Sequence, residues 1–490
     1  MTFLTVDAGV ELSARADRVV ARFFLPGEGT PGGSSRTQAV LDRVLALPPE
    51  ALAAAARRIR DRLVDPSPMA DVLQNAAMVR LPDAPHLGAD ATVVIGAAFT
   101  AEYSIEGVSL CNPSTVEHPD QTGLMPGQLR VLLSLRSIGE GHLSSIQFCT
   151  AVIGPGLTWE FLRRQAPPCL PAVRHGEWTR DHFLRALEHN GGTDELVDAI
   201  GQTLPNRFRG QVIEQAIQAL RAPLLQRRGA RAQLDAMRIV ADSAYDVIFP
   251  KESELSTRVL LPVADEERQG IEDLRLVQGL QADGARYGGT FTAYDGHAIS
   301  SRLLTTTDFR EFAVHRLTGP PAQTKGMALF PRQIGGEHLA LSRGDGESLA
   351  LTRSLDGLVW GAETILRTPT AAWEIVQIGN CGSPIETPQG WIVLTHGVGP
   401  LRVYSIGALL LDLEDPSRVI GVLPEPLIEP PQDSGGYVPN VVYSCGGLLH
   451  DGILWIPYGV DDQRIRVAHV NVQRLLSAMT APEDAGARRT

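Results

Sequence analysis

Short apolar runs, broken by glycine, proline, asparagine or aspartate, dominate this chain from about residue 93 and constrain its fold most strongly. Runs such as TVVIGAAF, RVLLSL, LALSR, WIVLTHGV and GILWIPYGV are typical of short β-strands joined by tight turns. The pattern covers 93–155 and returns from about 255 to 470. A chain of this kind is expected to be mainly β.

An approximate internal repeat predicts how the strands are organised. TTTDFREF at 305–312 and TRSLDGLVW at 352–360 share a polar turn followed by an aromatic residue. A period of roughly 50 to 60 residues in an all-β pattern favours propeller blades of about four strands. The five candidate blades are 93–155, 256–310, 311–367, 368–425 and 426–475. Periodicity alone leaves a pair of β-sandwiches open.

Two helical regions flank or interrupt this pattern. Pro49 and Glu50 open the alanine-rich segment PPEALAAAARRIRDRL, and both residues are helix-start signals. We therefore expect 1–92 to be an N-terminal helical extension and 93–475 to be the β domain. A helical insertion is expected at about 158–246, and a C-terminal tail at 476–490.

Charge and cysteine usage exclude several classes of function. The 490 residues carry a formal net charge of −12, which gives no general attraction to nucleic acid or to anionic membranes. The five cysteines include no CxxC pair, so we expect reduced thiols and no metal site. The first 20 residues do not resemble a signal peptide, and no run of about 18 apolar residues predicts a membrane span. A cytoplasmic protein is expected.

The segment Glu272-Asp273-Leu274-Arg275 carries the most informative chemistry. Side chains alternate along a strand, so Asp273 and Arg275 are expected to share one face while Glu272 points away. An adjacent guanidinium favours the ionised carboxylate. By itself, such a cluster is more often a surface salt bridge.

Other polar side chains fall at the ends of predicted strands, one set in each candidate blade. Lys325 and Arg343 are placed to converge on an anion, and His396 ends a strand after a glycine-rich turn. In a propeller, equivalent strand ends meet at one central funnel, where such groups suit a polyhydroxylated ligand.

These motifs, in their residues and in their order along the chain, resemble those of the mannoside phosphorylases and mannosidases of glycoside hydrolase family 130. The resemblance covers about 93–155 and 255–475. The matching motifs are Asn112-Pro113, Arg136, Glu272-Asp273-Leu274-Arg275, Lys325 before Leu329-Phe330-Pro331, the stretch 379–398 that ends in HGV, and Tyr458-Gly459 with Asp462. Two positions depart from the family pattern: Leu274 replaces a proline, and Ser342 stands where many relatives have histidine.

The resemblance implies a five-bladed propeller in which Asp273 is the general acid, acting through a sugar hydroxyl. The implied substrate-binding residues are Asn112, Arg136, Glu272, Tyr458 and Asp462. The implied phosphate-binding residues are Arg275, Lys325, Arg343 and His396. No metal or organic cofactor is implied. Inorganic phosphate would be the co-substrate and an oligosaccharide the partner, and a homo-oligomer is left open.

The same residues bear on the choice between phosphorolysis and hydrolysis. Inverting hydrolysis needs a carboxylate base to activate water, whereas phosphorolysis needs a basic cradle for phosphate. The lysine, arginine and histidine side chains favour a phosphorylase. An inverting β-mannoside hydrolase with Glu374, Glu386 or Asp345 as base remains the alternative, and a non-catalytic sugar-binding propeller is the third possibility.

Overall fold

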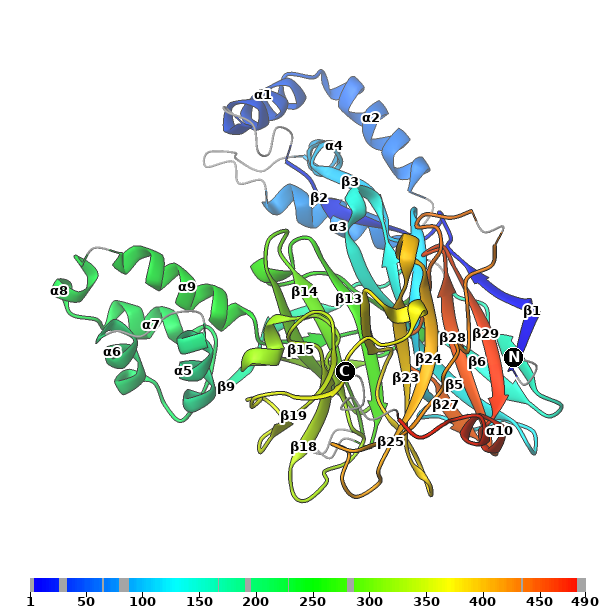
Figure 1. Cartoon of the computed structure of the whole chain (residues 1–490). Coiled ribbons are helices and arrows are strands. Elements are labelled where there is room, and N and C mark those ends of the chain that lie inside the picture. The colour runs from blue at the N-terminus through cyan, green and yellow to red at the C-terminus, as the bar shows by residue number, and fades with distance from the viewer. Residues whose placement is uncertain are drawn as a thin grey trace. The chain divides into compact units, whose positions relative to one another are not determined.

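The computed structural model describes residues 4–25, 33–63, 66–78, 88–165, 167–189, 195–227, 229–279, 286–432 and 435–482. The chain forms two compact units, Ala16–Ile105 and a larger one made of Met1–Arg15 with Glu106–Thr490. The larger unit is mainly β, as the sequence predicted (Figure 1). The expected boundary at residue 92 falls inside helix α4, Ala89–Ala98.

Outside the helical insertion, the described strands of the larger unit fall into five antiparallel groups. The first group is β4 (Ser109–Glu117), β5 (Leu129–Ile138), β6 (Ser144–Gly154) and β7 (Thr158–Phe161). The second is β13 (Gly270–Gln278), β14 (Tyr287–Tyr294), β15 (Ile299–Thr306) and β16 (Glu311–Arg316), extended by β11 (Tyr245–Ile248) and β8 (Ala172–His175). A single parallel bridge between Gly270 and Ser144 joins these two groups, and the short strand β12 (Val259–Leu260) pairs with β6.

The remaining three groups follow in chain order. The third is β17 (Ala328–Leu329), β18 (His338–Ser342), β19 (Leu349–Ser354) and β20 (Thr364–Arg367). The fourth is β21 (Gln377–Asn380), β22 (Ile385–Thr387), β23 (Gly390–Val398), β24 (Tyr404–Leu411) and β25 (Val419–Val422). The fifth is β26 (Val442–Tyr443), β27 (Leu448–His450), β28 (Ile453–Val460), β29 (Arg464–Asn471) and the N-terminal strand β1 (Leu4–Ser13), followed by helix α10 (Val472–Ser477).

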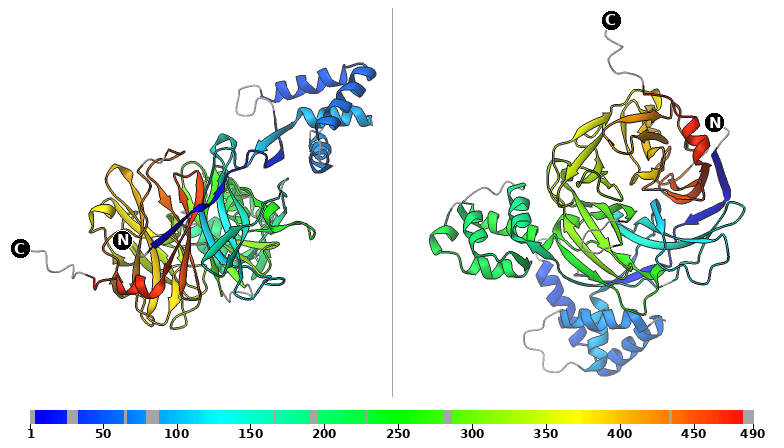
Figure 2. Two further views of the ribbon diagram at one scale, coloured as in Figure 1. Left: turned by 90° about the vertical axis from the view of Figure 1, so that its right-hand side faces the viewer. Right: turned by 90° about the horizontal axis from the view of Figure 1, so that it is seen from below.

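Strand β1 brings the two ends of the chain into one sheet. It pairs antiparallel with β29, and Glu11 contacts Arg464 and Arg466 on that strand. Seen from below, the strand groups of the larger unit succeed one another from cyan through green and yellow to red (Figure 2).

One expected group boundary, at 310/311, is wrong. Strand β16 pairs with β15 and therefore belongs to the second group. The polar segment between them is a hairpin turn, in which Thr306 Oγ1 accepts from the backbone N–H of Phe309 at 2.9 Å and Asp308 Oδ1 accepts from that of Arg310 at 2.8 Å. The turn was interpreted as the end of a blade because turns within and between strand groups share the same residues.

Helices interrupt the larger unit within the helical insertion predicted at about 158–246, but the first part of that range is wrong, because 158–161 and 172–175 are the strands β7 and β8. The helices are α5 (Arg180–His189), α6 (Glu195–Thr203), α7 (Val212–Gln218), α8 (Ala222–Leu225) and α9 (Ala230–Asp242), with the short strands β9 (Glu177–Thr179) and β10 (Arg207–Arg209). These helices bury a hydrophobic cluster of their own, which includes Trp178, Phe183 and Met237. They form a lobe at one side of the larger unit (Figures 1 and 2).

The described residues of the smaller unit form four helices and a two-stranded sheet. Its elements are β2 (Val19–Phe23), α1 (Gly33–Leu45), α2 (Pro49–Arg62), α3 (Pro66–Met78), α4 (Ala89–Ala98) and β3 (Thr100–Ser104). The run TVVIGAAF was expected to be a strand, but most of it lies in α4. Buried residues of α4 include Val93, Ile95 and Gly96. A short apolar run does not distinguish a buried helix from a strand, and here the tertiary packing decides.

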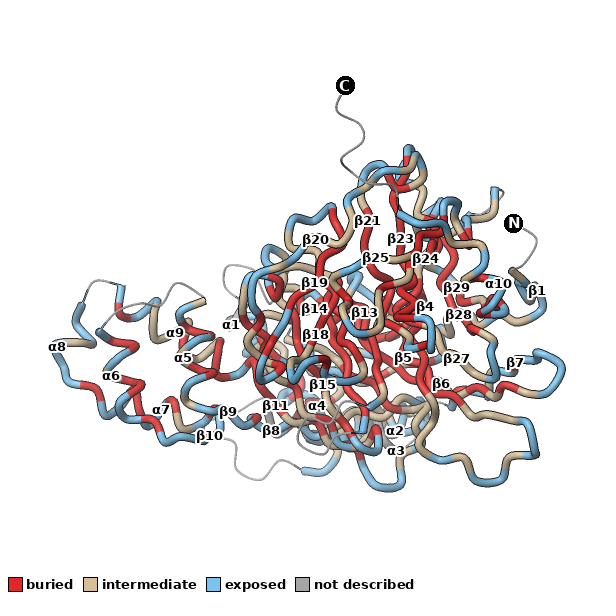
Figure 3. The backbone as a smooth tube through the Cα atoms, turned by 60° about the horizontal axis from the view of Figure 1, so that its bottom comes forward, coloured by how far each residue is buried: buried red, intermediate tan, exposed pale blue. Residues whose placement is uncertain are grey.

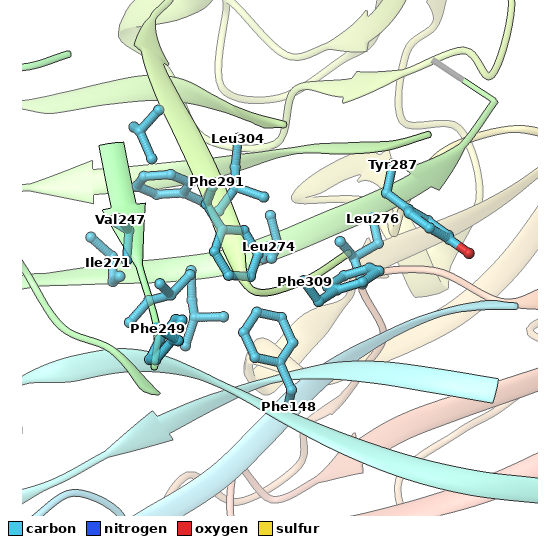
Figure 4. Packing of buried hydrophobic residues seen from close by; sticks show 14 of the residues in the cluster. Phe148, Val247, Phe249, Ile271, Leu274, Leu276, Tyr287, Phe291, Leu304 and Phe309 are labelled. Carbon is cyan, nitrogen blue, oxygen red and sulfur yellow. The ribbon is translucent and has the colours of Figure 1, made fainter. Parts of the chain in front are cut away.

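The core of the larger unit follows the strands, and buried backbone concentrates there (Figure 3). One cluster joins the first two strand groups. Figure 4 shows its packing, with Phe148 of β6 beside aromatic and aliphatic side chains of the second group. The rings of Phe148 and Phe312 stack with their centroids 5.6 Å apart. No helix among the described residues is long and apolar enough to cross a membrane.

Candidate active site

Two bulged strands bring a carboxylate and an amide together. The pairing of β13 with β14 shifts between Glu272 and Arg275, and Asp273 has a φ of 58°. The pairing of β4 with β5 shifts in the same way, and Asn112 has a φ of 49°. Asn112 Nδ2 donates to Asp273 Oδ1 at 2.7 Å. Left-handed backbone is uncommon outside glycine, although asparagine and aspartate adopt it most readily, and such residues gather at functional sites.

The bulge overturns the expected alternation along β13. Glu272 was expected to face away from Asp273, and that expectation is wrong. Arg136 contacts both carboxylates, at 2.7 Å from Nη2 to Glu272 Oε1 and 3.6 Å from Nη1 to Asp273 Oδ1. An extra residue in a strand interrupts the two-residue period, so neighbouring side chains reach the same partner.

Glu272 lies between two cations. Its Oε2 is 2.6 Å from Lys325 Nζ, and its Oε1 is held by Arg136, which also donates to Ser144 Oγ at 3.1 and 3.0 Å. Glu272 is buried, whereas Lys325 is about a third exposed. The charge of Lys325 is therefore compensated by a carboxylate in this structure.

Asp273 is buried and surrounded by cationic groups. Burial alone would raise its pKa, but Arg136 and Arg275, together with the hydrogen bond from Asn112, hold the pKa below its usual value. Arg275 Nη2 lies 3.8 Å from Asp273 Oδ2, and its Nη1 donates to the Asp273 carbonyl at 3.0 Å. Asp273 is thus ionised at neutral pH in this state of the site.

Asp462 belongs to the same charge cluster. It follows β28 in a turn with Asp461, and both aspartates have left-handed backbone. Burial raises the pKa of Asp462 to about 6; Arg136 opposes this shift and Asp273 adds to it. Tyr458, in contrast, lies in the hydrophobic cluster of the last two strand groups, with Ile456 and Val460.

A second cluster forms around His396 on β23. Arg343 Nη1 lies 3.0 Å from His396 Nε2, and Gln377 Nε2 lies 3.2 Å from the same atom. A guanidinium can only donate, so Nε2 accepts and Nδ1–H donates to the Asn380 carbonyl at 3.2 Å. Burial, reinforced by Arg343 and Arg275, lowers the pKa of His396 well below its usual value. The ring is neutral and orients Arg343.

Arg275 and Tyr443 connect the two clusters. Arg275 is buried, and its Nη2 donates to the Tyr443 hydroxyl at 3.0 Å. The Tyr443 and His396 rings lie 5.0 Å apart between centroids. Burial raises the pKa of the Tyr443 hydroxyl, so it remains protonated and can donate a hydrogen bond. Contacts therefore run from Asp273 through Arg275, Tyr443 and His396 to Arg343.

Most of the residues singled out in the sequence meet in this region. The residues that contact one another are Asn112, Arg136, Glu272, Asp273, Arg275 and Lys325 in the first cluster and Arg343 with His396 in the second. Sequence reasoning missed Ser144, Gln377 and Tyr443. Tyr443 lies in the short strand β26, and a tyrosine within a short apolar strand has no distinguishing spacing.

The arrangement offers a carboxylate, hydrogen-bond donors and basic side chains in one largely buried network. Arg343 hydrogen-bonds a neutral ring, so its charge remains available to an anion. Among the described residues, no group of three histidine, cysteine, aspartate or glutamate side chains is placed to hold a metal ion. Acid catalysis next to an oxyanion site is the chemistry that this geometry supports.

Comparisons with known proteins agree with the chemistry of the site. The glycoside hydrolase 130 family model, described as beta-1,4-mannooligosaccharide phosphorylase, matches residues 230–481. A 1,2-beta-oligomannan phosphorylase of Thermoanaerobacter sp. (strain X514) is 34% identical over 222 residues, which cover 44% of this chain and 72% of the relative. A beta-1,2-mannobiose phosphorylase of the same organism is 31% identical over 219 residues, with 44% and 72% coverage.

A solved structure has also been compared with this chain. The beta-1,2-mannobiose phosphorylase from Listeria innocua, in complex with beta-1,2-mannobiose, is 20% identical with a TM-score of 0.45. The match covers 77% of this chain and 92% of the Listeria chain.

Proposed function

The chain belongs to glycoside hydrolase family 130, and from this premise we propose that it is an inverting phosphorylase of β-mannosides. The reaction transfers a mannosyl unit to inorganic phosphate, gives mannose 1-phosphate and is reversible. The observation that carries the proposal is the buried network that joins Asp273 through Arg275 and Tyr443 to His396 and Arg343. The network connects the proposed acid, Asp273, to Arg343, the side chain proposed to bind the anion.

In this proposal Asp273 is the general acid and acts through a sugar hydroxyl. Asn112, Arg136 and Asp462 hold the mannosyl unit, because their amide, guanidinium and carboxylate groups supply both donors and acceptors to hydroxyls. Glu272 keeps Arg136 in place by a contact of 2.7 Å. Tyr458 would act indirectly, by supporting the strand that leads to Asp462, since its ring is packed in the core.

Phosphate binding is proposed at Arg343, with Arg275 and the Tyr443 hydroxyl alongside. An arginine fork suits a phosphate bidentately, and the His396 ring fixes the orientation of Arg343. Lys325 would join the cradle only by sharing its charge with Glu272, which it contacts at 2.6 Å. No metal or organic cofactor is required by this scheme.

The lowered pKa of Asp273 gives phosphate a second role. An ionised carboxylate cannot donate a proton, so the acid has to gain one before bond cleavage. A phosphate dianion beside Arg275 and Arg343 would offset the positive field on Asp273 and raise its pKa. Binding of phosphate would thereby favour the protonated form of Asp273, which can act as a general acid.

The bases considered for a hydrolase have other partners. Glu374 is buried and contacts Arg367 at 2.6 Å, and Glu386 contacts Arg332 at 2.8 Å. Asp345 Oδ1 accepts from two backbone N–H groups of its own turn, at 2.8 and 2.7 Å. Glu374 and Glu386 thus pair with arginines outside the Asp273 network. Burial would raise the pKa of Asp345, but the hydrogen bonds of its turn and the charge of Arg343 lower it, so Asp345 is the candidate base of the alternative hydrolase.

The same premise supports a finer fold assignment. We propose that the five antiparallel strand groups are the blades of a five-bladed propeller and that β1 completes the last blade next to β29. The polar residues of the site come from all five groups or the segments joining them, which is the arrangement that a central funnel requires. A cytoplasmic location and a homo-oligomer remain predictions.

The test is synthesis from mannose 1-phosphate. The purified protein is incubated with mannose 1-phosphate and a panel of acceptor sugars, and phosphate release is followed. Release that requires an acceptor and is lost in Asp273→Asn supports the phosphorylase and identifies its acceptor. No release with any acceptor, together with phosphate-independent liberation of mannose from β-mannosides, would instead identify a hydrolase. Saturable sugar binding without turnover would identify a binding protein.

A further inference from the structure

A cavity of about 410 Å³ lies at the edge of the second strand group. Its walls are the turn between β14 and β15, the end of β16, the short helices 265–267 and 320–323, and His189 at the end of α5. The volume is within the range of small-molecule sites, roughly 300–1,000 Å³. The helical insertion therefore contributes to a site-sized cavity.

The cavity adjoins the catalytic network through two side chains. Lys325 Nζ contacts Glu272 and also lies 5.8 Å from the centre of the Tyr294 ring. Asp295, the next residue after Tyr294, lines the cavity, as does Gln323, two residues before Lys325. Ser301 Oγ donates to the Thr324 carbonyl at 3.0 Å, which ties these two segments together. Lys325, which contacts Glu272, and Tyr294 are thus within two residues of the cavity lining along the chain.

The charges in the lining favour a neutral ligand. Glu266 contacts both Arg316 of the lining and the buried Arg302 behind it, and Asp295 adds a second carboxylate. Burial, with Arg316 nearby, lowers the pKa of His189, so its ring is neutral at pH 7. The two carboxylates leave no excess positive charge to hold an anion.

The hydrogen-bonding groups of the lining are both donors and acceptors. They include the Ser300 hydroxyl, the Gln323 amide, the His297 ring and the guanidinium of the buried Arg316. Ile299 and Leu317 supply apolar surface between them. Hydroxyls with intervening C–H faces match this mixture, because each hydroxyl both donates and accepts.

We propose that this cavity is a subsite for the distal sugar units of an oligosaccharide whose reacting unit lies at Asp273. The inference rests on the proposed function and extends it, because it assigns a preference for substrates longer than a disaccharide. The insertion that carries α5 then contributes to chain-length specificity through His189.

The test compares chain lengths in a variant whose cavity is filled. Ala298→Trp places an indole at the cavity mouth from an exposed turn and keeps the backbone N–H that donates to Asp295 Oδ1. We expect kcat/KM for a β-mannobiose to stay within about twofold and kcat/KM for the trimer and tetramer to fall about tenfold, the effect of losing one or two hydrogen bonds. His297→Ala should act in the same direction. Leu355→Trp, at a turn position that is 80% exposed and outside the lining, is the control.

Binding measured without turnover separates this proposal from the proposed function. A β-mannotetraose is titrated calorimetrically into Asp273→Asn protein, with and without Ala298→Trp. Weaker binding in the double variant supports the subsite even if the wild-type protein turns over no mannoside. Equal losses at every chain length, or unchanged kinetics and binding in both cavity variants, would overturn the subsite while leaving a measured phosphorylase activity intact.

Discussion

Replacing Gly379 by alanine is expected to disrupt the proposed phosphate site around Arg343 while sparing the residues proposed to hold the mannosyl unit. A Cβ at this position would lie 2.6 Å from Cε1 of His396, 3.1 Å from its Nε2 and 3.4 Å from Cδ of Arg343. Carbon atoms prefer about 3.5–4.0 Å, so the ring has to move by about 1 Å. The shift would disturb the bonds of His396 to the Asn380 carbonyl and to Arg343.

The magnitude follows from the role of orientation in catalysis. A misplacement of about 1 Å in a positioning group can cost about 10²-fold in rate. We therefore expect kcat/KM for phosphate to fall about 100-fold in Gly379→Ala, with KM for the mannoside changed less than about threefold. The assay is initial-rate phosphorolysis with each substrate varied in turn.

The control keeps the same chemical change at a permissive position. A Cβ at Gly361 would meet nothing closer than the Arg353 carbonyl at 3.4 Å, so Gly361→Ala should behave like the wild type. Unchanged phosphate kinetics in a folded Gly379→Ala protein would refute the reasoning, because His396 and Arg343 would then not hold phosphate.

Three other perturbations test separate parts of the account. Because bound phosphate should raise the lowered pKa of Asp273, phosphate binding at mildly acidic pH should be accompanied by proton uptake at this carboxyl; calorimetry in buffers of different ionisation enthalpy measures this uptake, and Asp273→Asn should reduce it. Glu106→Gln leaves the buried guanidinium of Arg164, 2.8 Å away, without its carboxylate, and should cost about 3–5 kcal/mol of unfolding free energy in denaturant titrations. Deleting 4–13 exposes the edge of β29 and should lower the unfolding temperature and promote self-association, which light scattering detects; an unchanged protein in any of these three tests would contradict the corresponding structural role.

The sequence singled out residues that the structure brings together, but it did not predict their geometry. Asp273, Arg275 and Asn112 could be identified because acidic, basic and amide residues stand in an ordered set of motifs. The contact of Glu272 with Arg136 could not be predicted, because it depends on a bulge in β13. A bulge adds one residue to a strand and leaves no reliable signal in the residue pattern.

The fold class could also be predicted from the sequence, but individual elements and long-range strand pairings could not. Short apolar runs broken by turn residues indicated a mainly β chain, and helix-start signals indicated the helical regions. The helix α4 was missed because a short apolar run suits either a strand or a buried helix. The pairing of β1 with β29 joins residues more than 450 positions apart, as Leu4 opposite Val470 shows, and no local pattern specifies such a partner.

The central claim is that the protein transfers a mannosyl unit to phosphate with inversion. The most direct measurement is a 31P NMR time course of a β-mannooligosaccharide with inorganic phosphate, with Asp273→Asn as the reference. We expect α-mannose 1-phosphate to appear at the rate at which phosphate is lost, and we expect no reaction with the Asp273→Asn protein. Free mannose released at the same rate with and without phosphate would contradict it.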